Sequence, residues 1–346
     1  MKALLLSEYR RLEVTDVPRP VPGPEEVLVR VAACGICGSD VHGYDGSSGR
    51  RIPPIIMGHE AAGIVAALGK GVTGIAEGDR VAFDSTVYCG SCDFCLRGQV
   101  NLCDRRQVLG VSCPDYRRAG AFAEFVVIPS RIVYRLPDNL SFAQAAMLEP
   151  VAVALHAISL TRLDANSTAL VVGAGMIGLL ALQALLVAGC SRVIVVDVDP
   201  SRLKLAENMG ATALLQASDP DLLPRIVRFS REGVDVAVEA VGKNETVSLA
   251  ISSVRKGGNV ILVGNVSPEV TLPLQKVVTG QIRLQGSCAS SGEYPRAIEL
   301  LASDAIQVKP LITAIASLDE GPKWFERLYA REPNLMKIVL TPGMVS

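Results

Sequence analysis

Residues 168–286 alternate short apolar strands with helical segments, and this alternation constrains the fold more than any other feature of the sequence. Six strands are predicted, at 169–172, 192–197, 213–216, 234–239, 260–263 and 282–286. Helices are predicted in the gaps, at 175–188, 200–209 and 245–254. A helix between two strands brings the chain back so that the second strand runs parallel to the first. The pattern therefore predicts an α/β fold with a doubly wound parallel sheet.

A glycine-rich turn joins the first of these strands to its helix and is typical of dinucleotide binding. Gly173 permits a tight turn, Gly175 lets a pyrophosphate approach the backbone, and Gly178 allows close helix–strand packing. The start of the helix offers free amides and a positive dipole to phosphates. Asp197 ends the next strand at the spacing where an acidic residue binds the adenosine ribose, with a helix cap as the alternative. Its charge would repel a 2′-phosphate, which favours NAD over NADP, although Arg202 could hold such a phosphate.

The chain before residue 141 has a different pattern, with short β-branched runs between Gly and Pro residues. Strands are predicted at 26–33, 61–68, 79–83 and 121–128. They indicate a small, closed or partly closed β structure. A serine-capped helix is predicted at 141–146, Pro150 interrupts it, and a helix continues over 151–160.

The chain has 346 residues, which is too long for one typical core and favours two domains. After residue 290, a helix at 294–302 and a strand at 337–340 are predicted that do not belong to the parallel sheet. We expect them to return to the first domain. The predicted domains are 1–148 with 290–346, and 149–289.

Four closely spaced cysteines form the most specific motif: Cys89, Cys92, Cys95 and Cys103. Four thiolates can close a tetrahedron around Zn²⁺ without an open position, so such a site is structural. An iron–sulfur cluster is the alternative, but the surrounding sequence offers nothing else for electron transfer. The chain has nine cysteines, and an odd number without a secretion signal argues against a disulfide framework.

A second set of possible metal ligands is spread along the chain: Cys37, His59, Glu60 and Glu149. One thiolate, one imidazole and a carboxylate with water would form an open, catalytic zinc site. Such a site binds an alcohol oxygen and lowers the pKa of the alcohol. Spacing alone does not bring these residues together, and a core cysteine with surface carboxylates is the alternative.

Polar residues just after Cys37 are candidates for proton transfer. Ser39 and His42 could pass a proton from the bound alcohol to solvent, and Asp40 could orient a metal-binding histidine. A helix cap and an exposed histidine are the alternatives. Arg50 and Arg51 are interpreted as solvated loop charges rather than a phosphate site.

Together these motifs resemble the zinc-containing medium-chain dehydrogenases over essentially the whole chain. The resemblance is carried by 37–42, 58–60, the four clustered cysteines, 173–178 and Asp197. The segment 148–156, Leu-Glu-Pro-Val-Ala-Val-Ala-Leu-His, looks like the polyol branch with sorbitol, galactitol-phosphate and threonine dehydrogenases. In that branch a glutamate serves at the catalytic zinc, where ethanol-type enzymes carry cysteine.

The resemblance implies a GroES-like β-barrel catalytic domain, a Rossmann NAD-binding domain, and one catalytic and one structural Zn²⁺ in each subunit. It implies that Cys37, His59 and either Glu60 or Glu149 hold the catalytic zinc. Dimers or tetramers, including a homotetramer, are expected from the family. The cofactor contacts that it implies are Gly173, Gly175, Ile177, Gly178, Asp197, Arg202, Val263, Gly264, Asn265, Ser287, Cys288 and Ala289.

The predicted function is hydride transfer from a secondary alcohol, a polyol, polyol phosphate or related sugar derivative, to NAD. The segment 286–292 lacks the arginine and the aromatic residue of sorbitol enzymes, so the resemblance does not favour sorbitol itself. An L-threonine 3-dehydrogenase-like enzyme and an NADP-dependent carbonyl reductase are the alternatives. A non-catalytic, zinc-stabilised binding protein is the alternative from another class.

Composition argues against several other partners. The net charge is −1 without a basic or acidic block, so nothing favours nucleic acid. The N-terminal apolar run is too short for a signal peptide, and no apolar stretch reaches the roughly twenty residues of a spanning helix. The nearest to that length is 177–187. We therefore expect a cytoplasmic protein with a small-molecule alcohol as substrate and no membrane partner.

Overall fold

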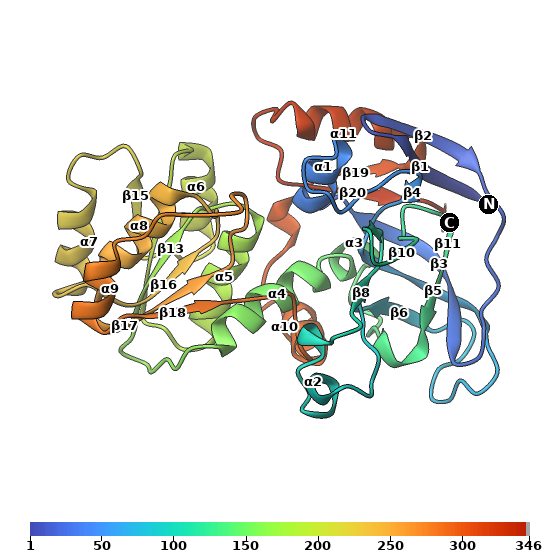
Figure 1. Ribbon diagram of the computed structural model, residues 1–346, viewed down its shortest axis with the longest axis horizontal. Coiled ribbons are helices and arrows are strands. Elements are labelled where there is room, and N and C mark those ends of the chain that lie inside the picture. Colours follow the sequence, from blue (N-terminus) through green and yellow to red (C-terminus); the bar gives the residue numbers. More distant parts are fainter. Residues whose placement is uncertain (344–346) are drawn as a thin grey trace. The chain divides into compact units, whose positions relative to one another are not determined.

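The computed structural model describes residues 1–343 and divides the chain into two compact units (Figure 1). Unit 1 contains Met1–Glu149, Tyr294–Ser303 and the chain from Val308 onward. Unit 2 contains Pro150–Glu293 and Asp304–Gln307. The predicted division after residue 289 differs from this one because the chain stays in unit 2 as far as Glu293.

The short return of the chain to unit 2 has a simple cause. Gln183 holds the segment at both of its amide atoms, because Oε1 accepts from Gln307 N (2.7 Å) and Nε2 donates to Gln307 O (3.1 Å). Ile306 is buried beside it. A side chain in the middle of a helix thus decides where residues 304–307 belong, and no local pattern predicts such a contact.

Unit 1 is built on a seven-stranded sheet in the order β12-β6-β5-β3-β20-β19, with β11 also paired to β3. Its strands are β3 (Glu26–Gly35), β5 (Glu60–Leu68), β6 (Arg80–Phe83), β11 (Phe125–Pro129), β12 (Val133–Arg135), β19 (Ile312–Ser317) and β20 (Lys337–Thr341). Smaller sheets contain β1 (Lys2–Glu8), β2 (Arg11–Asp16) and β4 (Ile55–Ile56); β7 (Thr86–Val87) and β8 (Gln107–Val108); and β9 (Val111–Ser112) and β10 (Arg117–Arg118). Its helices are α1 (Gly38–Tyr44), α2 (Asp93–Leu96), α3 (Phe142–Ala145), α10 (Tyr294–Ala302) and α11 (Gly321–Tyr329).

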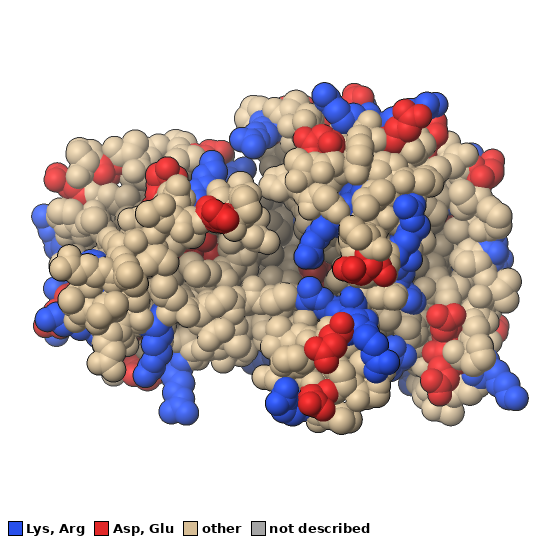
Figure 2. All heavy atoms as spheres, in the orientation of Figure 1, with Lys and Arg blue, Asp and Glu red and all other residues tan. Residues whose placement is uncertain are grey.

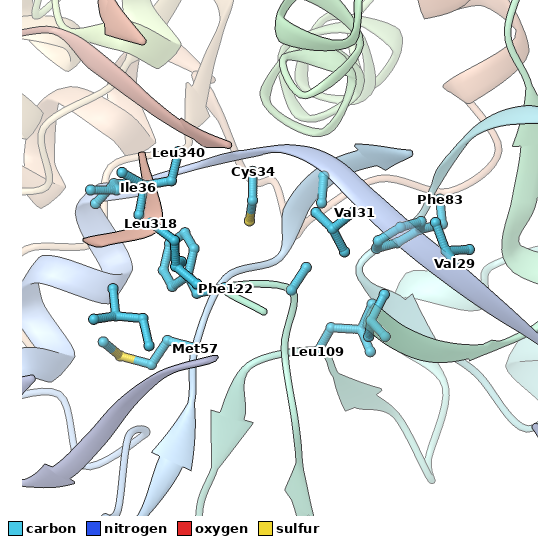
Figure 3. Packing of buried hydrophobic residues seen from close by; sticks show 14 of the residues in the cluster. Val29, Val31, Cys34, Ile36, Met57, Phe83, Leu109, Phe122, Leu318 and Leu340 are labelled. Carbon is cyan, nitrogen blue, oxygen red and sulfur yellow. The ribbon is translucent and has the colours of Figure 1, made fainter. Parts of the chain in front are cut away.

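The core of unit 1 joins distant parts of the chain (Figure 3). Val29 and Val31 of the central strand β3 pack in one cluster with Phe122. Leu318 and Leu340 reach the same cluster from the C-terminal part of the chain. Burying these side chains stabilises the fold by roughly 1.5–3 kcal/mol each. The first and last parts of the sequence are therefore needed for one core.

Unit 2 contains the predicted parallel sheet, with six strands in the order β15-β14-β13-β16-β17-β18. The strands are β13 (Thr168–Val172), β14 (Arg192–Asp197), β15 (Ala213–Gln216), β16 (Val234–Glu239), β17 (Val254–Leu262) and β18 (Arg283–Gly286). The helices are α4 (Leu148–Ser159), which begins in unit 1, α5 (Met176–Val187), α6 (Pro200–Asn208), α7 (Leu222–Ser230), α8 (Asn244–Ser253) and α9 (Leu274–Gly280). Helices α5 and α6 pack on β13–β15, and α8 packs on β13, β16 and β17.

Several predicted element bounds are wrong. The strand predicted at 121–128 begins only at Phe125, because Ala121 N and Phe122 N donate to the backbone oxygens of Gly58 and Met57 (2.8 and 3.0 Å). Pro150 does not interrupt a helix, since it lies in the first turn of α4, where its missing N–H costs nothing. Helices α7 and α9, together with β1, β2, β19 and α11, were not predicted.

The segment over α3 and α4, Phe142–Ser159, is long and apolar enough to cross a membrane by length and composition alone. It has a mean hydropathy of 1.3, and 67% of it is buried inside the protein, as in many core helices. It replaces 177–187 as the longest such stretch, because Pro150 does not divide it.

Acidic and basic side chains are intermixed on the face that Figure 2 shows.

Candidate functional site

Helix α1 and the residue before it carry four of the residues considered in the sequence analysis. Cys37 is the residue just before its first turn, and Asp40 Oδ2 accepts a hydrogen bond from Cys37 N (3.2 Å). Asp40 therefore caps the helix, as one alternative predicted. Ser39 and His42 are exposed on the same helix.

A left-handed glycine leads into the second pair of predicted ligands. Gly58 has φ +91°, and a Cβ there would lie 2.8 Å from Phe122 Cδ1 and 2.9 Å from Cys34 Sγ. Only glycine fits this turn without a clash. The turn feeds directly into β5, so that His59 and Glu60 are both buried at the start of the strand.

Three of the four scattered ligand candidates come together. One ligand atom each from Cys37, His59 and Glu60 lies within 4.8 Å of the other two. A thiolate, an imidazole and a carboxylate are donors that suit Zn²⁺, and three protein ligands leave a further position open. The donor set therefore fits a catalytic zinc ion. Glu149 is not in this group, so the described part of the chain favours Glu60 as the carboxylate beside the cysteine and the histidine.

Glu149 nevertheless belongs to the surroundings of this group. Although part of the residue reaches the surface, desolvation of its carboxyl group raises the pKa of Glu149 to about 7. Negative charge on Glu60 and Asp84 acts in the same direction, while His59 opposes it. A carboxyl group with this pKa can carry a proton near neutral pH.

Lys337 is a site residue that the sequence interpretation missed. Its Nζ lies 2.5 Å from Glu60 Oε2 and donates to Ile36 O at 3.1 Å, and the residue is 2% exposed. Burial alone would lower the pKa of Lys337, but the Glu60 carboxylate raises it above its ordinary value. Gly35 leaves room for this pair, because a Cβ there would lie 2.4 Å from Glu60 Oε2. The only signal in the sequence was a lysine in an otherwise apolar strand.

Asp40 connects the histidine to a buried arginine. His59 Nδ1 lies 3.4 Å from Asp40 Oδ1, an ion-pair distance without the alignment of a full hydrogen bond. This contact favours a proton on Nδ1 and leaves Nε2 for a metal. The prediction that Arg51 is a solvated charge is wrong, because Arg51 is 4% exposed and pairs with Asp40 at 2.9 Å. Burial would raise the pKa of Asp40, but His59 and Arg51 hold it well below its ordinary value.

The four clustered cysteines also converge. Their sulfur atoms all lie within 4.8 Å of one another, with Cys92 and Cys95 3.5 Å apart and Cys89 and Cys95 3.9 Å apart. Sulfur atoms on a zinc tetrahedron are about 3.8 Å apart, given Zn–S bonds of about 2.3 Å. The cluster therefore fits a closed, structural zinc site.

Backbone amides prepare the cysteine cluster for a cation. Ser91 N and Cys92 N donate to Cys89 Sγ at 3.4 and 3.3 Å. These hydrogen bonds, with that of Ser91 the larger influence, lower the pKa of Cys89 to about 5. Arg105 was not predicted; its Nη2 donates to Ser91 Oγ (2.6 Å), which keeps its positive charge near the thiolates.

In unit 2, the glycine turn has the backbone geometry expected of a nucleotide loop. Gly173 has φ +98°, and a Cβ on Gly178 would lie 1.7 Å from Gly173 O, so both positions exclude side chains. A Cβ on Gly175 would meet nothing within 4 Å, and Gly175 stands just before helix α5. The loop therefore has open space at the helix N-terminus, where phosphates bind. Ile177, in the first turn, is half-buried.

Asp197 lies beside this loop at the end of β14. It is 7% exposed, its Oδ2 accepts from Ala174 N (2.6 Å) and its Oδ1 accepts from Asp199 N (2.8 Å). Asp199, rather than Asp197, caps helix α6, since its side chain accepts from Ser201 N. The helix-cap alternative for Asp197 is therefore wrong. Arg202 Nε lies 3.7 Å from Asp199 Oδ2.

The remaining predicted cofactor contacts lie after β17 and β18. Val263 N and Gly264 N both donate to Glu239 O, at 2.9 and 3.0 Å. The sequence interpretation missed Glu239, a fully buried carboxylate that accepts from Val241 N and Gly242 N. Asn265 and Cys288 are exposed, Ser287 and Ala289 are half-buried, and the Ser287 hydroxyl has no hydrogen-bond partner in the described chain.

Comparison with known proteins supports both units. The model of the alcohol dehydrogenase GroES-like domain matches residues 23–138, and that of the zinc-binding dehydrogenase family matches residues 177–303. The chain is 36% identical to a sorbitol dehydrogenase of Bacillus subtilis, over 99% of this chain and 98% of that protein.

Solved structures agree with this result. The fold superimposes on galactitol-1-phosphate dehydrogenase from Escherichia coli with a TM-score of 0.91 and 29% identity, covering 99% of this chain and 100% of that one. A zinc-binding dehydrogenase from Sinorhizobium meliloti bound to NADP gives a TM-score of 0.89 and 33% identity, with 99% of each chain covered.

The chain belongs to the zinc-containing medium-chain alcohol dehydrogenase family, with a GroES-like domain and a parallel-sheet dehydrogenase domain. Its relatives include polyol dehydrogenases, so it is an alcohol dehydrogenase of the polyol-dehydrogenase type.

Proposed function

We propose that this protein oxidises a secondary alcohol of a polyol, polyol phosphate or related sugar derivative with NAD⁺, using a zinc ion held by Cys37, His59 and Glu60. The observation that carries the proposal is the convergence of these three ligand types within 4.8 Å. The structural zinc would bind to the four clustered cysteines. A binding protein without activity would not need a metal site with an open position.

The bound zinc would supply Lewis-acid polarisation of the substrate hydroxyl, and the bound nicotinamide would supply a hydride acceptor. Asp40 orients His59, and Lys337 holds Glu60 in place. Ser39 Oγ accepts a hydrogen bond from Arg51 Nη2 (3.3 Å), which leaves its own O–H free to donate onward. In the proposed relay, Ser39 passes its own hydroxyl proton towards His42 as it accepts the substrate proton, and the exposed His42 releases a proton to solvent.

The proposed preference for NAD rests on Asp197 and Arg202. The Asp197 carboxylate lies beside the glycine turn, where it can accept from ribose hydroxyls and would repel a 2′-phosphate. Arg202 is within 3.7 Å of Asp199, so part of its charge is already balanced. The NADP found in the Sinorhizobium relative makes NADP the competing possibility.

The test is an assay of NADH and NADPH formation with zinc-loaded protein on polyols, polyol phosphates and amino alcohols. We expect turnover of a polyol or polyol phosphate with NAD⁺, and a loss of turnover in Glu60→Gln but not in the exposed control Glu299→Gln. Turnover only of amino alcohols would favour a threonine dehydrogenase-like enzyme, and a preference for NADP⁺ would favour the reductase. Two bound zinc ions without turnover of any compound would favour the non-catalytic alternative.

We further propose that the protein is cytoplasmic and forms dimers or tetramers. The expected location rests on the composition of the chain, and the expected oligomeric state rests on the family resemblance. Cell fractionation and light scattering of the purified protein test them, and a monomer at micromolar concentration would contradict the second.

A further inference from the structure

Arg51 occupies an unusual place for a loop arginine. It lies between α1 and β4. Two backbone hydrogen bonds to Ser112 fix the residues on either side of it: Ile52 N donates to Ser112 O (3.0 Å), and Ser112 N donates to Arg50 O (3.3 Å). Its side chain lies against α1 at Gly43, where a Cβ would be 2.0 Å from Arg51 Cγ. A glycine in this helix therefore makes room for the arginine, although glycine costs a helix about 1 kcal/mol.

The guanidinium group binds two residues of α1 at once. Nη2 donates to Asp40 Oδ1 (2.9 Å) and to Ser39 Oγ (3.3 Å), and Nε donates to Asp40 Oδ1 (3.3 Å). Nη1 donates to Arg50 O (3.0 Å). The flat, forked arrangement of guanidinium donors allows these contacts from one side chain, which the single ammonium of lysine does not.

Asp40 passes this constraint to two of the proposed zinc ligands. Its Oδ1 lies 3.4 Å from His59 Nδ1, and its Oδ2 accepts from Cys37 N (3.2 Å). Asp40 is 0% exposed, so without Arg51 its charge would be buried with only the imidazole as a balancing group. One carboxylate therefore links the arginine, the histidine and the cysteine.

We propose that Arg51 is a positioning residue for the catalytic centre: it holds Asp40, and through Asp40 the His59 ring and the Cys37 backbone, and it directs the Ser39 hydroxyl outward for proton transfer. The inference rests on the proposed function, in which Cys37 and His59 bind the catalytic zinc. Arg51 and His59 share the same oxygen of Asp40, so losing the arginine frees the carboxylate to move towards the imidazole. The ligand geometry and the direction of the Ser39 O–H would change together.

The test compares the full-length wild type with Arg51→Met, Arg51→Lys and the control Arg50→Met, whose side chain is exposed. Zinc retained by each protein is measured during titration with a chelator, with NAD⁺-dependent kcat and KM alongside. In Arg51→Met we expect affinity for one of the two zinc ions and kcat to fall by about 10- to 100-fold, as for other residues that orient metal ligands. Arg51→Lys should recover part of the affinity, and the KM for NAD⁺ should stay unchanged.

The second zinc ion is an internal control, because the hydrogen bonds of the Arg51 side chain go to Ser39, Asp40 and Arg50 and to none of the four clustered cysteines. If Arg51→Met unfolds, the double variant Asp40→Asn/Arg51→Met removes both buried charges. It should fold and still bind the catalytic zinc weakly. The absorption spectrum of the cobalt-substituted protein gives a further readout, since it should change in the Arg51 variants and stay the same in Arg50→Met.

The outcomes separate this inference from the proposed function. A wild type with two zinc ions and polyol turnover, together with Arg51 variants of unchanged zinc affinity and unchanged kcat, would overturn the inference and leave the proposed function standing. A wild type that binds zinc only at the cysteine cluster would overturn both. Equal losses in Arg50→Met and Arg51→Met would show a general effect of loop charge and would also overturn the positioning role.

Discussion

The two candidate zinc sites of unit 1 are built in different ways. The cysteine cluster takes its four ligands from residues 89–103, lies partly at the surface, and satisfies its sulfur atoms with nearby backbone amides. The other group takes its ligands from the residue that precedes α1 and from the two residues where β5 begins, and Asp40, Arg51 and Lys337 surround it with buried charge. The first site needs a loop, whereas the second needs the folded domain.

The different construction of the two sites suits them to different roles. A local loop can close completely around an ion, which gives stability and excludes substrate. A site assembled from separate elements can leave a position open while buried partners orient each ligand. Substitutions in the two sites should therefore differ in their effects, and the largest effect is expected at Cys37.

Replacing a cysteine in each site should separate activity from stability. Cys37→Ala should lower kcat/KM by at least about a hundred-fold, because a zinc ion contributes several kcal/mol to stabilising the transition state. Its melting temperature should change little. Kinetics and thermal unfolding on the same preparations check both effects. Wild-type activity in Cys37→Ala would disprove the assignment of the catalytic site.

Removing Lys337 should show how much buried charge the assembled site holds. In the metal-free protein, Lys337→Met leaves Glu60 buried without a cation and should lower the free energy of unfolding by about 3–5 kcal/mol. The matched control is Lys204→Met, whose ion pair with Glu207 has the same 2.5 Å distance but is exposed. It should cost only about 0–1 kcal/mol. Chemical denaturation of zinc-loaded and metal-free protein checks both, and equal effects would contradict the comparison.

Cys92→Ala should give the opposite result to Cys37→Ala. Loss of the loop zinc should lower the free energy of unfolding by more than about 2 kcal/mol, because metal binding contributes directly to folding. The kcat of the protein that remains folded should stay within about two-fold of the wild type, given that structural sites do not touch substrate. Metal analysis should find one zinc ion per chain. A complete loss of kcat at low temperature would show that the two sites are not independent.

A partly buried pair in unit 2 tests whether long-range charge contacts stabilise the fold without a metal. His156 Nδ1 lies 2.7 Å from Glu293 Oε1. Burial would raise the pKa of Glu293, but the hydrogen bond to His156 lowers it below its ordinary value of 4.5. A carboxyl group whose pKa is lowered by folding stabilises the protein at pH values above its ordinary pKa of 4.5. This contribution is lost as the pH falls through the lowered pKa.

Glu293→Gln should therefore be less stable than the wild type by about 1–2 kcal/mol above pH 5, and this difference should shrink as the pH falls below about 4.5. Denaturation curves of both proteins across this range give the difference directly. A difference that does not depend on pH would mean that the pair acts through packing alone.

Local patterns were enough for much of unit 2. The strands predicted at 192–197, 213–216 and 234–239 coincide with β14, β15 and β16. Each is a short apolar run between helices, and the parallel sheet follows from their alternation. The glycine turn could also be predicted, because the positive φ of Gly173 belongs to the turn itself and a Cβ on Gly178 would meet Gly173 O within the same turn. By contrast, β17 begins earlier than predicted, at Val254, through pairing with β16 that its own sequence does not announce.

The available groups could be read from the amino-acid sequence: four thiols at zinc-binding spacing, a nucleotide turn, and a thiol, an imidazole and carboxylates for a second metal. Only the tertiary structure decided that Glu60 rather than Glu149 joins Cys37 and His59, and that Arg51 and Lys337 are buried partners rather than solvated charges. The difference arises because these contacts join residues that are far apart in the sequence. Spacing along the chain sets local turns, but the contact between Lys337 and Glu60 depends on β20 lying beside β3 and β3 pairing with β5.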